Sequence, residues 1–201
     1  MKNRMIWIAA LLLTTTAQAQ TPDGGVWGSV QAGHSWSNGW YANVRAEYRQ
    51  RGTGLDLWFV RPTVGRRLTP WLKVDLGADR FATSSAVQLR GLLSATVTLK
   101  QGPLTASLRE RYILSRNVHS GAVGHLFRSQ LKVAYTVPQS VLTPYVAVEV
   151  YGWDHWRQTH HFAGTRLRLG KTHAIDLFYL YGTSASKPEL HAIGVGYEAT
   201  L

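Results

Sequence analysis

The stretch from Trp40 to Arg51, WYANVRAEYRQR, alternates apolar and polar side chains. Its even positions from Trp40 to Tyr48 are apolar, whereas its odd positions from Asn43 to Arg51 are polar or charged. A period of two residues is typical of a β-strand with one apolar face and one charged face. One such strand fits a soluble sandwich as well as a barrel, so the fold depends on how often the pattern recurs.

The alternation recurs to Leu201 and is clearest from Val87 to Leu99. Short turns rich in Gly, Pro and Asn follow one another at intervals of about thirty residues, which is the period of a hairpin. They lie near residues 38, 70, 102, 139 and 171. Five hairpins predict ten strands after residue 40, and Val26 to Gly33 has the pattern of an eleventh. Because single-chain bacterial barrels have even strand numbers, we expect ten strands with this segment outside or inside the wall, or twelve with a short strand added.

The N-terminus has the features of a secretion signal. Lys2 and Arg4 precede an apolar run from Met5 to Leu13, and Ala17-Gln18-Ala19 is a small-residue cleavage site. We therefore predict a signal peptide over residues 1–19 and one domain over residues 20–201. An uncleaved anchor helix is the alternative, but the apolar run is too short to span a bilayer.

Composition narrows the class of protein. The chain has 22 Lys and Arg against 11 Asp and Glu, and it has no Cys. A basic chain suggests nucleic-acid binding, but these cations alternate with apolar residues along strands and the chain carries an export signal, so we expect no nucleic-acid partner. The absence of Cys excludes disulfides and thiolate metal sites. No apolar run after the signal is long enough for a membrane helix, so any membrane crossing would use strands.

These patterns predict an all-β transmembrane antiparallel up-and-down barrel of about ten strands, within a range of ten to twelve. The tryptophans support it, because they fall in two groups near the two kinds of connection, as membrane girdles do. The groups are Trp36, Trp40 and Trp71, and Trp58, Trp153 and Trp156. A soluble sandwich or lipocalin-like carrier, which buries its tryptophans within strands, is the alternative.

The connections between the short turns contain more loop residues, which predicts that the short turns and the end of the last strand face the periplasm. The expected location is the outer membrane of a Gram-negative bacterium. Expected partners are outer-membrane lipid and lipopolysaccharide, and the barrel-assembly machinery through the C-terminal strand. The sequence leaves the oligomeric state open.

Several segments resemble the exported bacterial barrel family catalogued as domain of unknown function 2490. They are SNGWYANVRAEYR (37–49), FVRPTVG (59–65), LTASLRERY (104–112), FRSQLKVAY (127–135), LTPYVAVEVY (142–151) and HAIDLFYLYG (173–182). The best-matching positions are Arg109, Arg111, Pro144-Tyr145, Glu149 and Asp176. The resemblance covers nearly the whole mature chain. It implies an outer-membrane barrel of unassigned function and supplies no catalytic residues.

If the apolar faces meet lipid, the charged faces line the lumen. The predicted lumen cations are Arg45, Arg49, Arg61, Lys73, Arg90, Arg109, Arg111, Arg128, Lys132, Arg166 and Arg168, and the acids opposite them are Glu47, Asp75, Asp79, Glu149 and Asp176. One interpretation is a cross-strand ion-pair network that fills and stiffens a narrow barrel. The other is a cation-lined lumen that binds or passes small anions. Glu110 falls on the apolar face, so we expect it near a rim or at a register slip.

An enzyme is the alternative function: an outer-membrane hydrolase or lipid A-modifying enzyme that uses residues of the outer loops. Its candidate residues are His119, His125, Asp154, His155, His160, His161 and His191. Asp154 and His155 are adjacent only in sequence, and neighbouring strand residues point to opposite faces. No G-x-S-x-G or HExxH motif occurs. We therefore expect a non-enzymatic barrel with no cofactor and no metal site.

Overall fold

The computed structural model describes residues 24–52, 54–185 and 189–201, so the predicted signal peptide lies outside the described residues. The described residues form eleven strands and contain no helix long and apolar enough to cross a membrane. The strands are β1 (Gly24–Ser35), β2 (Trp40–Arg51), β3 (Gly54–Arg67), β4 (Leu72–Thr83), β5 (Val87–Gln101), β6 (Leu104–Asn117), β7 (Val123–Tyr135), β8 (Leu142–Gly152), β9 (Trp156–Leu169), β10 (His173–Ser184) and β11 (Leu190–Thr200).

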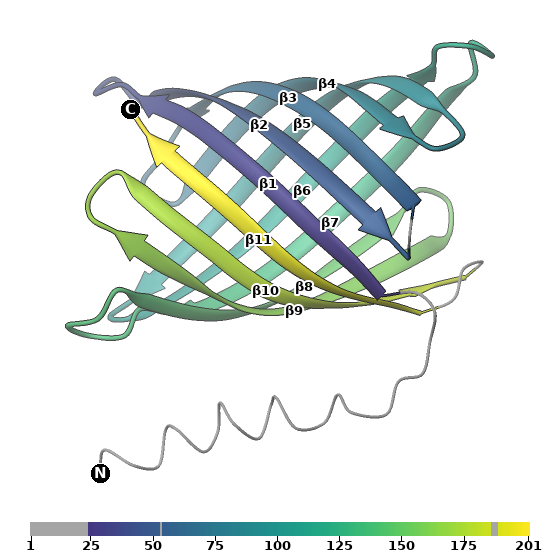
Figure 1. Cartoon of the computed structure of the whole chain (residues 1–201). Helices are drawn as coiled ribbons and strands as arrows, with labels where there is room; N and C mark the ends of the chain where they lie inside the picture. The colour runs from purple at the N-terminus through teal and green to yellow at the C-terminus, as the bar shows by residue number, and fades with distance from the viewer. Residues whose placement is uncertain (1–23, 53, 186–188) are drawn as a thin grey trace.

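The strands close into one barrel in which each strand pairs with its neighbours in sequence (Figure 1). Every pair is antiparallel except β1 and β11, which run parallel from Gly24 opposite His191 to Gly33 opposite Thr200. The predicted all-β barrel of ten to twelve strands is confirmed. The expectation that an odd N-terminal segment lies outside or inside the wall is wrong. An odd number of strands closes when the first and last run in the same direction, and β1 closes the wall in this way.

We call the end where β11 stops the C-terminal rim and the end where β1 starts the N-terminal rim. The predicted difference in connection length between the two ends is not found. The connection from Tyr135 to Leu142 lies at the C-terminal rim and is longer than that from Arg51 to Gly54 at the N-terminal rim. The six tryptophans of the predicted girdles are all exposed near the two rims, as expected.

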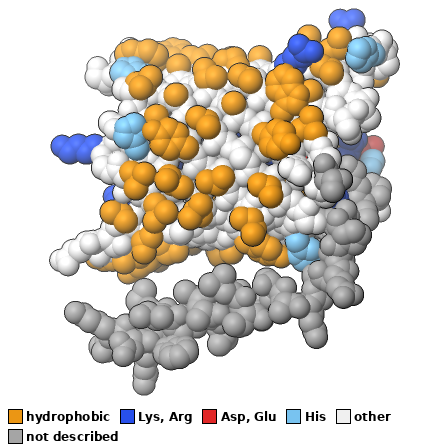
Figure 2. Space-filling view, viewed as in Figure 1, with side chains coloured by type: hydrophobic (Ala, Val, Ile, Leu, Met, Phe, Trp, Pro, Cys, Tyr) orange, Lys and Arg blue, Asp and Glu red, His pale blue; other side chains and the backbone are white. Residues whose placement is uncertain are grey.

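The two faces of the wall divide as the alternation predicts. Figure 2 shows apolar side chains spread over the outer face of the strands in view, with Lys and Arg mainly at its margins. Glu110 is a carboxylate that points outward from the middle of β6, where Ser129 of β7 donates a 2.5 Å hydrogen bond to Glu110 Oε2. The register there is continuous, so Glu110 lies neither at a rim nor at a slip. The serine hydroxyl supplies the partner that a carboxylate on this face needs.

Candidate functional site: an ion-pair layer and a cationic cavity

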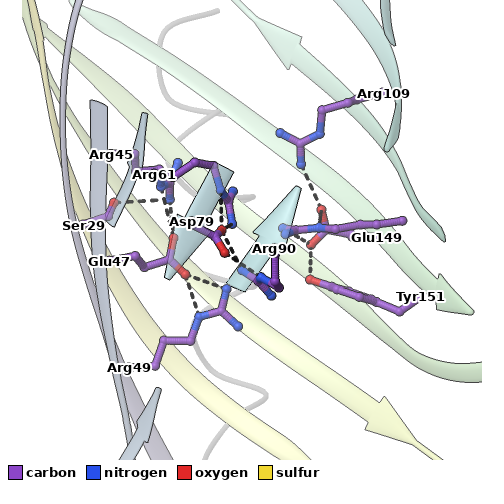
Figure 3. Close-up of polar contacts among 11 residues, drawn as sticks. Ser29, Arg45, Glu47, Arg49, Arg61, Asp79, Arg90, Arg109, Glu149 and Tyr151 are labelled. Carbon is purple, nitrogen blue, oxygen red and sulfur yellow. Dashed lines mark hydrogen bonds and ion pairs between the residues drawn. The ribbon is translucent and has the colours of Figure 1, made fainter. Parts of the chain in front are cut away.

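Three buried carboxylates inside the barrel each lie between two arginines, and we call these nine residues the ion-pair layer (Figure 3). The contacts are Arg45 Nη2 to Glu47 Oε2 at 2.7 Å, Arg49 Nη2 to Glu47 Oε1 at 2.5 Å, Arg61 Nη2 to Asp79 Oδ2 at 2.6 Å, Arg90 Nε to Asp79 Oδ1 at 2.7 Å, Arg109 Nη2 to Glu149 Oε1 at 3.0 Å and Arg128 Nη2 to Glu149 Oε2 at 2.7 Å. Each negative charge thus faces two positive charges, and the layer carries a net positive charge.

The strand periodicity explains how the first two groups form. Arg45, Glu47 and Arg49 are two residues apart on β2, so all three point into the lumen. Asp79 on β4 lies opposite Arg90 on β5. The second arginine of this group, Arg61, comes from β3, the other neighbour of β4. The contacts of Asp79 join β4 to both of its neighbouring strands and therefore stiffen the wall.

Glu149 is the most enclosed of the three acids, with none of its surface exposed. The hydroxyl of Tyr151 donates to Glu149 Oε2 at 2.6 Å, in addition to the two arginines. Arg109 reaches Glu149 from β6, across the intervening strand β7. A buried carboxylate with two charged donors and a phenol donor has its desolvation well compensated.

Apolar side chains fill the lumen around these ion pairs. Trp27 is 6% exposed and packs against Leu180, Leu190 and Ala192, and the guanidinium of Arg49 lies 3.5 Å from its ring centroid. Phe59, Leu92 and Ile113 are also buried inside the barrel. Charged and aromatic groups thus interlock in the half of the lumen toward the N-terminal rim.

The other half of the lumen contains a cavity of about 340 Å³. Its wall carries Lys73, Arg111 and Lys132, and none of these three cations forms an ion pair with a carboxylate of the described residues. Arg111 donates to Ser94 Oγ at 2.9 Å, and Lys132 Nζ lies 3.5 Å from the ring centroid of Tyr145. Asp75, Asp176 and Glu198 also line the cavity, but its wall carries more cations than carboxylates.

The cavity continues toward the C-terminal rim. A second hollow of about 250 Å³ shares Tyr41, Lys73 and Glu198 with it and extends to Trp36 and Gly39 at that rim. On the side away from this hollow, the 340 Å³ cavity is lined by aromatic residues, including Trp27. The lumen is thus hollow toward the C-terminal rim and packed toward the N-terminal rim.

The predicted lumen residues occupy three kinds of position. Those that line the cavity are Arg45, Arg49, Arg61, Lys73, Arg109, Arg111, Arg128, Lys132, Arg166, Glu47, Asp75 and Asp176. Arg90, Asp79 and Glu149 belong to the ion-pair layer but do not line the cavity, whereas the other six residues of the layer do both. Arg168 is exposed at the end of β9, where its Nη2 donates to the carbonyl oxygen of Ser140 at 3.0 Å.

Sequence reasoning did not pair the acids with their partners. Asp75 was expected to face arginine but accepts a 3.0 Å hydrogen bond from the Tyr41 hydroxyl, and Asp176 has no ion pair among the described residues. Arg166 instead pairs with Glu198 of β11 at 2.7 Å. In the sequence, Glu198 alternates with the apolar residues Val195, Tyr197 and Ala199 of the last strand, and this pattern could have indicated a position in the lumen.

The family whose description is "Protein of unknown function (DUF2490)" matches residues 24–189. The chain belongs to this family. The match covers β1 to β10 and the connection before β11, so it includes all three groups of the ion-pair layer in the DUF2490 barrel. No curated protein matches the sequence.

Solved structures similar to the DUF2490 barrel include two porins. The NanC porin is 16% identical with a TM-score of 0.54, and the match covers 83% of this chain and 93% of that one. The KdgM porin is 13% identical with a TM-score of 0.52, covering 79% and 84%. The KdgM porin in complex with disordered oligogalacturonate gives 13% identity and a TM-score of 0.52, covering 78% and 82%. At such identities the likeness shows a porin-like barrel fold.

The histidines of the enzyme alternative do not converge in the DUF2490 barrel. His160 packs inside the lumen beside Trp27, whereas His161 points outward against Tyr181. His125 and His191 form hydrogen bonds with tyrosine hydroxyls of the outer face. Asp154 and His155 are 2.6 Å apart, but both side chains are about two-thirds exposed to solvent. Among the described residues no group of three or more His, Asp or Glu is placed to hold a metal ion.

Proposed function

We propose that the protein is a non-enzymatic outer-membrane barrel of a Gram-negative bacterium that binds small anionic solutes in its lumen and passes them across the membrane. The observation that carries this proposal is the cavity wall with Lys73, Arg111 and Lys132, three cations without a carboxylate partner among the described residues. A water-filled, confined site with net positive charge lowers the barrier for anions and raises it for cations.

The polar groups of the cavity wall support binding of a solute with both charge and hydroxyls. Thr96 Oγ1, Arg109 Nε and Asp176 Oδ1 are buried at this wall without a hydrogen-bond partner in the protein. Buried polar atoms normally have a partner, so such atoms at a cavity wall indicate polar contents. A hydroxyl and a carboxylate oxygen beside the cations can bond to hydroxyl groups, so the wall suits a hydroxylated anion better than a bare halide.

The chemistry of one structural neighbour agrees with this solute class. One of its solved structures is the KdgM porin in complex with disordered oligogalacturonate, a sugar chain in which each unit carries a carboxylate. The ion-pair layer narrows the path beyond the cavity, so passage requires its side chains to part. We therefore assign the cavity the role of an anion-binding vestibule and the layer the role of the constriction.

Calorimetric titration of the refolded mature protein in detergent with trigalacturonate tests the binding step. We expect binding that weakens with added salt, and affinity at least about tenfold lower in the variant Lys73→Gln/Arg111→Gln/Lys132→Gln, because each lost contact is a hydrogen bond to a charged group. Replacing these three cations breaks no ion pair, because none of them is paired with a carboxylate of the described residues.

Two controls sharpen this titration. Arg66→Gln removes a cation from the outer face, where it lies over Trp40, and should leave binding unchanged. Maltotriose, a neutral sugar of similar size, should bind far more weakly than trigalacturonate. Equal affinity of the wild type and the triple variant for trigalacturonate would refute the proposed role of these cations.

A further inference from the structure

Two arginines lie on the outer, lipid-facing side of the wall near the N-terminal rim. Arg80 precedes the end of β4 by three residues and Arg116 precedes the end of β6 by one. Asp79 and Arg111 point into the lumen, so Arg80 and Arg116, of the opposite parity on their strands, point outward. Both are exposed, and neither forms an ion pair or hydrogen bond with a described residue. Cations on a lipid-facing surface are costly unless something anionic meets them.

The two arginines flank one residue of the strand between them. In the sheet register Arg80 is opposite Leu89 on β5, and Leu89 is opposite Arg116 on β6. Two strand spacings separate the arginine backbones by roughly 10 Å. Arginine side chains are long enough to bind the same anion across that distance, with each guanidinium bound to a different oxygen of it.

A groove of about 640 Å³ opens on the same face directly beside this pair. Its wall includes Pro62, Ala78, Gly91 and Leu114 as well as both arginines. Gly91 lies opposite Ala78 on one side and Leu114 on the other, and a Cβ built on it would meet no atom within 4 Å. Small residues thus create an apolar depression that begins at the two cations and leads toward the membrane interior.

We infer that this groove binds an anionic lipid of the membrane, with its phosphate between Arg80 and Arg116 and one acyl chain over Ala78 and Gly91. Charge and shape both favour this occupant: the cations lie toward the rim, where headgroups lie, and the apolar part lies deeper. A soluble anion would leave the apolar groove unused, and a neutral lipid would leave the arginines without a partner. The inference rests on the proposed membrane location and is independent of what the lumen binds.

Native mass spectrometry of the folded mature barrel, released from micelles that contain equal amounts of phosphatidylglycerol and phosphatidylcholine with identical acyl chains, tests this inference. We expect the wild type to retain phosphatidylglycerol preferentially. Arg80→Gln/Arg116→Gln should lower that occupancy roughly thirtyfold, because each cation near a membrane surface contributes about a factor of five. Gly91→Leu, whose Cβ would meet no atom within 4 Å, adds a side chain in the depression and should lower the retention of both lipids.

Arg66→Gln is the matched control, because it removes one outward arginine near the opposite rim and should leave retention unchanged. Heat-dependent gel migration confirms that each variant is a folded barrel, and trigalacturonate titration confirms that its lumen is intact. Equal retention of the two lipids by the wild type, unchanged phosphatidylglycerol retention in Arg80→Gln/Arg116→Gln, or unaltered retention in Gly91→Leu would overturn the inference. Failure of the lumen titration alone would count against the proposed function and leave this site standing.

Discussion

Replacing Glu149 with Gln should lower the free energy of unfolding by about 3–5 kcal/mol. The change keeps the size of the side chain but leaves Arg109 and Arg128 without the carboxylate that neutralises them. Glu149 is fully buried, so water cannot take the place of its charge. Urea unfolding of the refolded barrel in lipid vesicles, followed by tryptophan fluorescence, measures the loss.

Glu198→Gln is the matched comparison, because Glu198 pairs with Arg166 where the two side chains are 36% and 40% exposed. Exposed ion pairs contribute about 1 kcal/mol or less, so this variant should unfold almost as the wild type does. If both variants lost the same small amount, Glu149 would not be holding the layer together, and the buried ion pairs would have no special part in stability.

Replacing Trp27 with Ala should cost about 3–5 kcal/mol and should also raise ionic conductance. Trp27 is the largest apolar side chain of the packed half of the lumen, and it forms part of the cavity floor. Its loss leaves a void beside Leu180 and Ala192 and frees the guanidinium of Arg49 that lies on its ring. The constriction therefore widens at the point where the cavity ends.

Trp58→Ala provides the control for this prediction, since Trp58 is 37% exposed on the outer face. We expect a clearly smaller loss of stability and no change of conductance, because no void forms inside the barrel. Planar-bilayer recordings of both variants separate the two effects. A conductance that is the same in Trp27→Ala and Trp58→Ala would show that the path does not pass Trp27.

The sequence predicted the wall of this barrel far better than its interior. Strict alternation, as at Arg45, Glu47 and Arg49, shows which residues share a face. In the structure both of these arginines form ion pairs with Glu47. The partner of Glu149 was not predictable in the same way. Arg109 is forty residues distant, and which strands face each other across the lumen depends on the stagger of the closed sheet.

Two other features lay beyond the pattern for physical reasons. Ile113 and Leu92 point into the lumen, but each stands within an apolar run, so alternation could not assign their faces. Closure by a parallel β1–β11 pair was missed because a hairpin count considers antiparallel neighbours alone. The rule of even strand numbers then favoured ten or twelve over the eleven strands that the described residues form.

We expect the lumen to select anions through Lys73, Arg111 and Lys132. The reversal potential of the widened Trp27→Ala barrel across a potassium chloride gradient tests this selectivity. We predict a potential of the sign set by chloride, which moves toward zero when the three cations are replaced by Gln. A cation-selective current, no current at all, or a potential unchanged by the triple replacement would contradict the account.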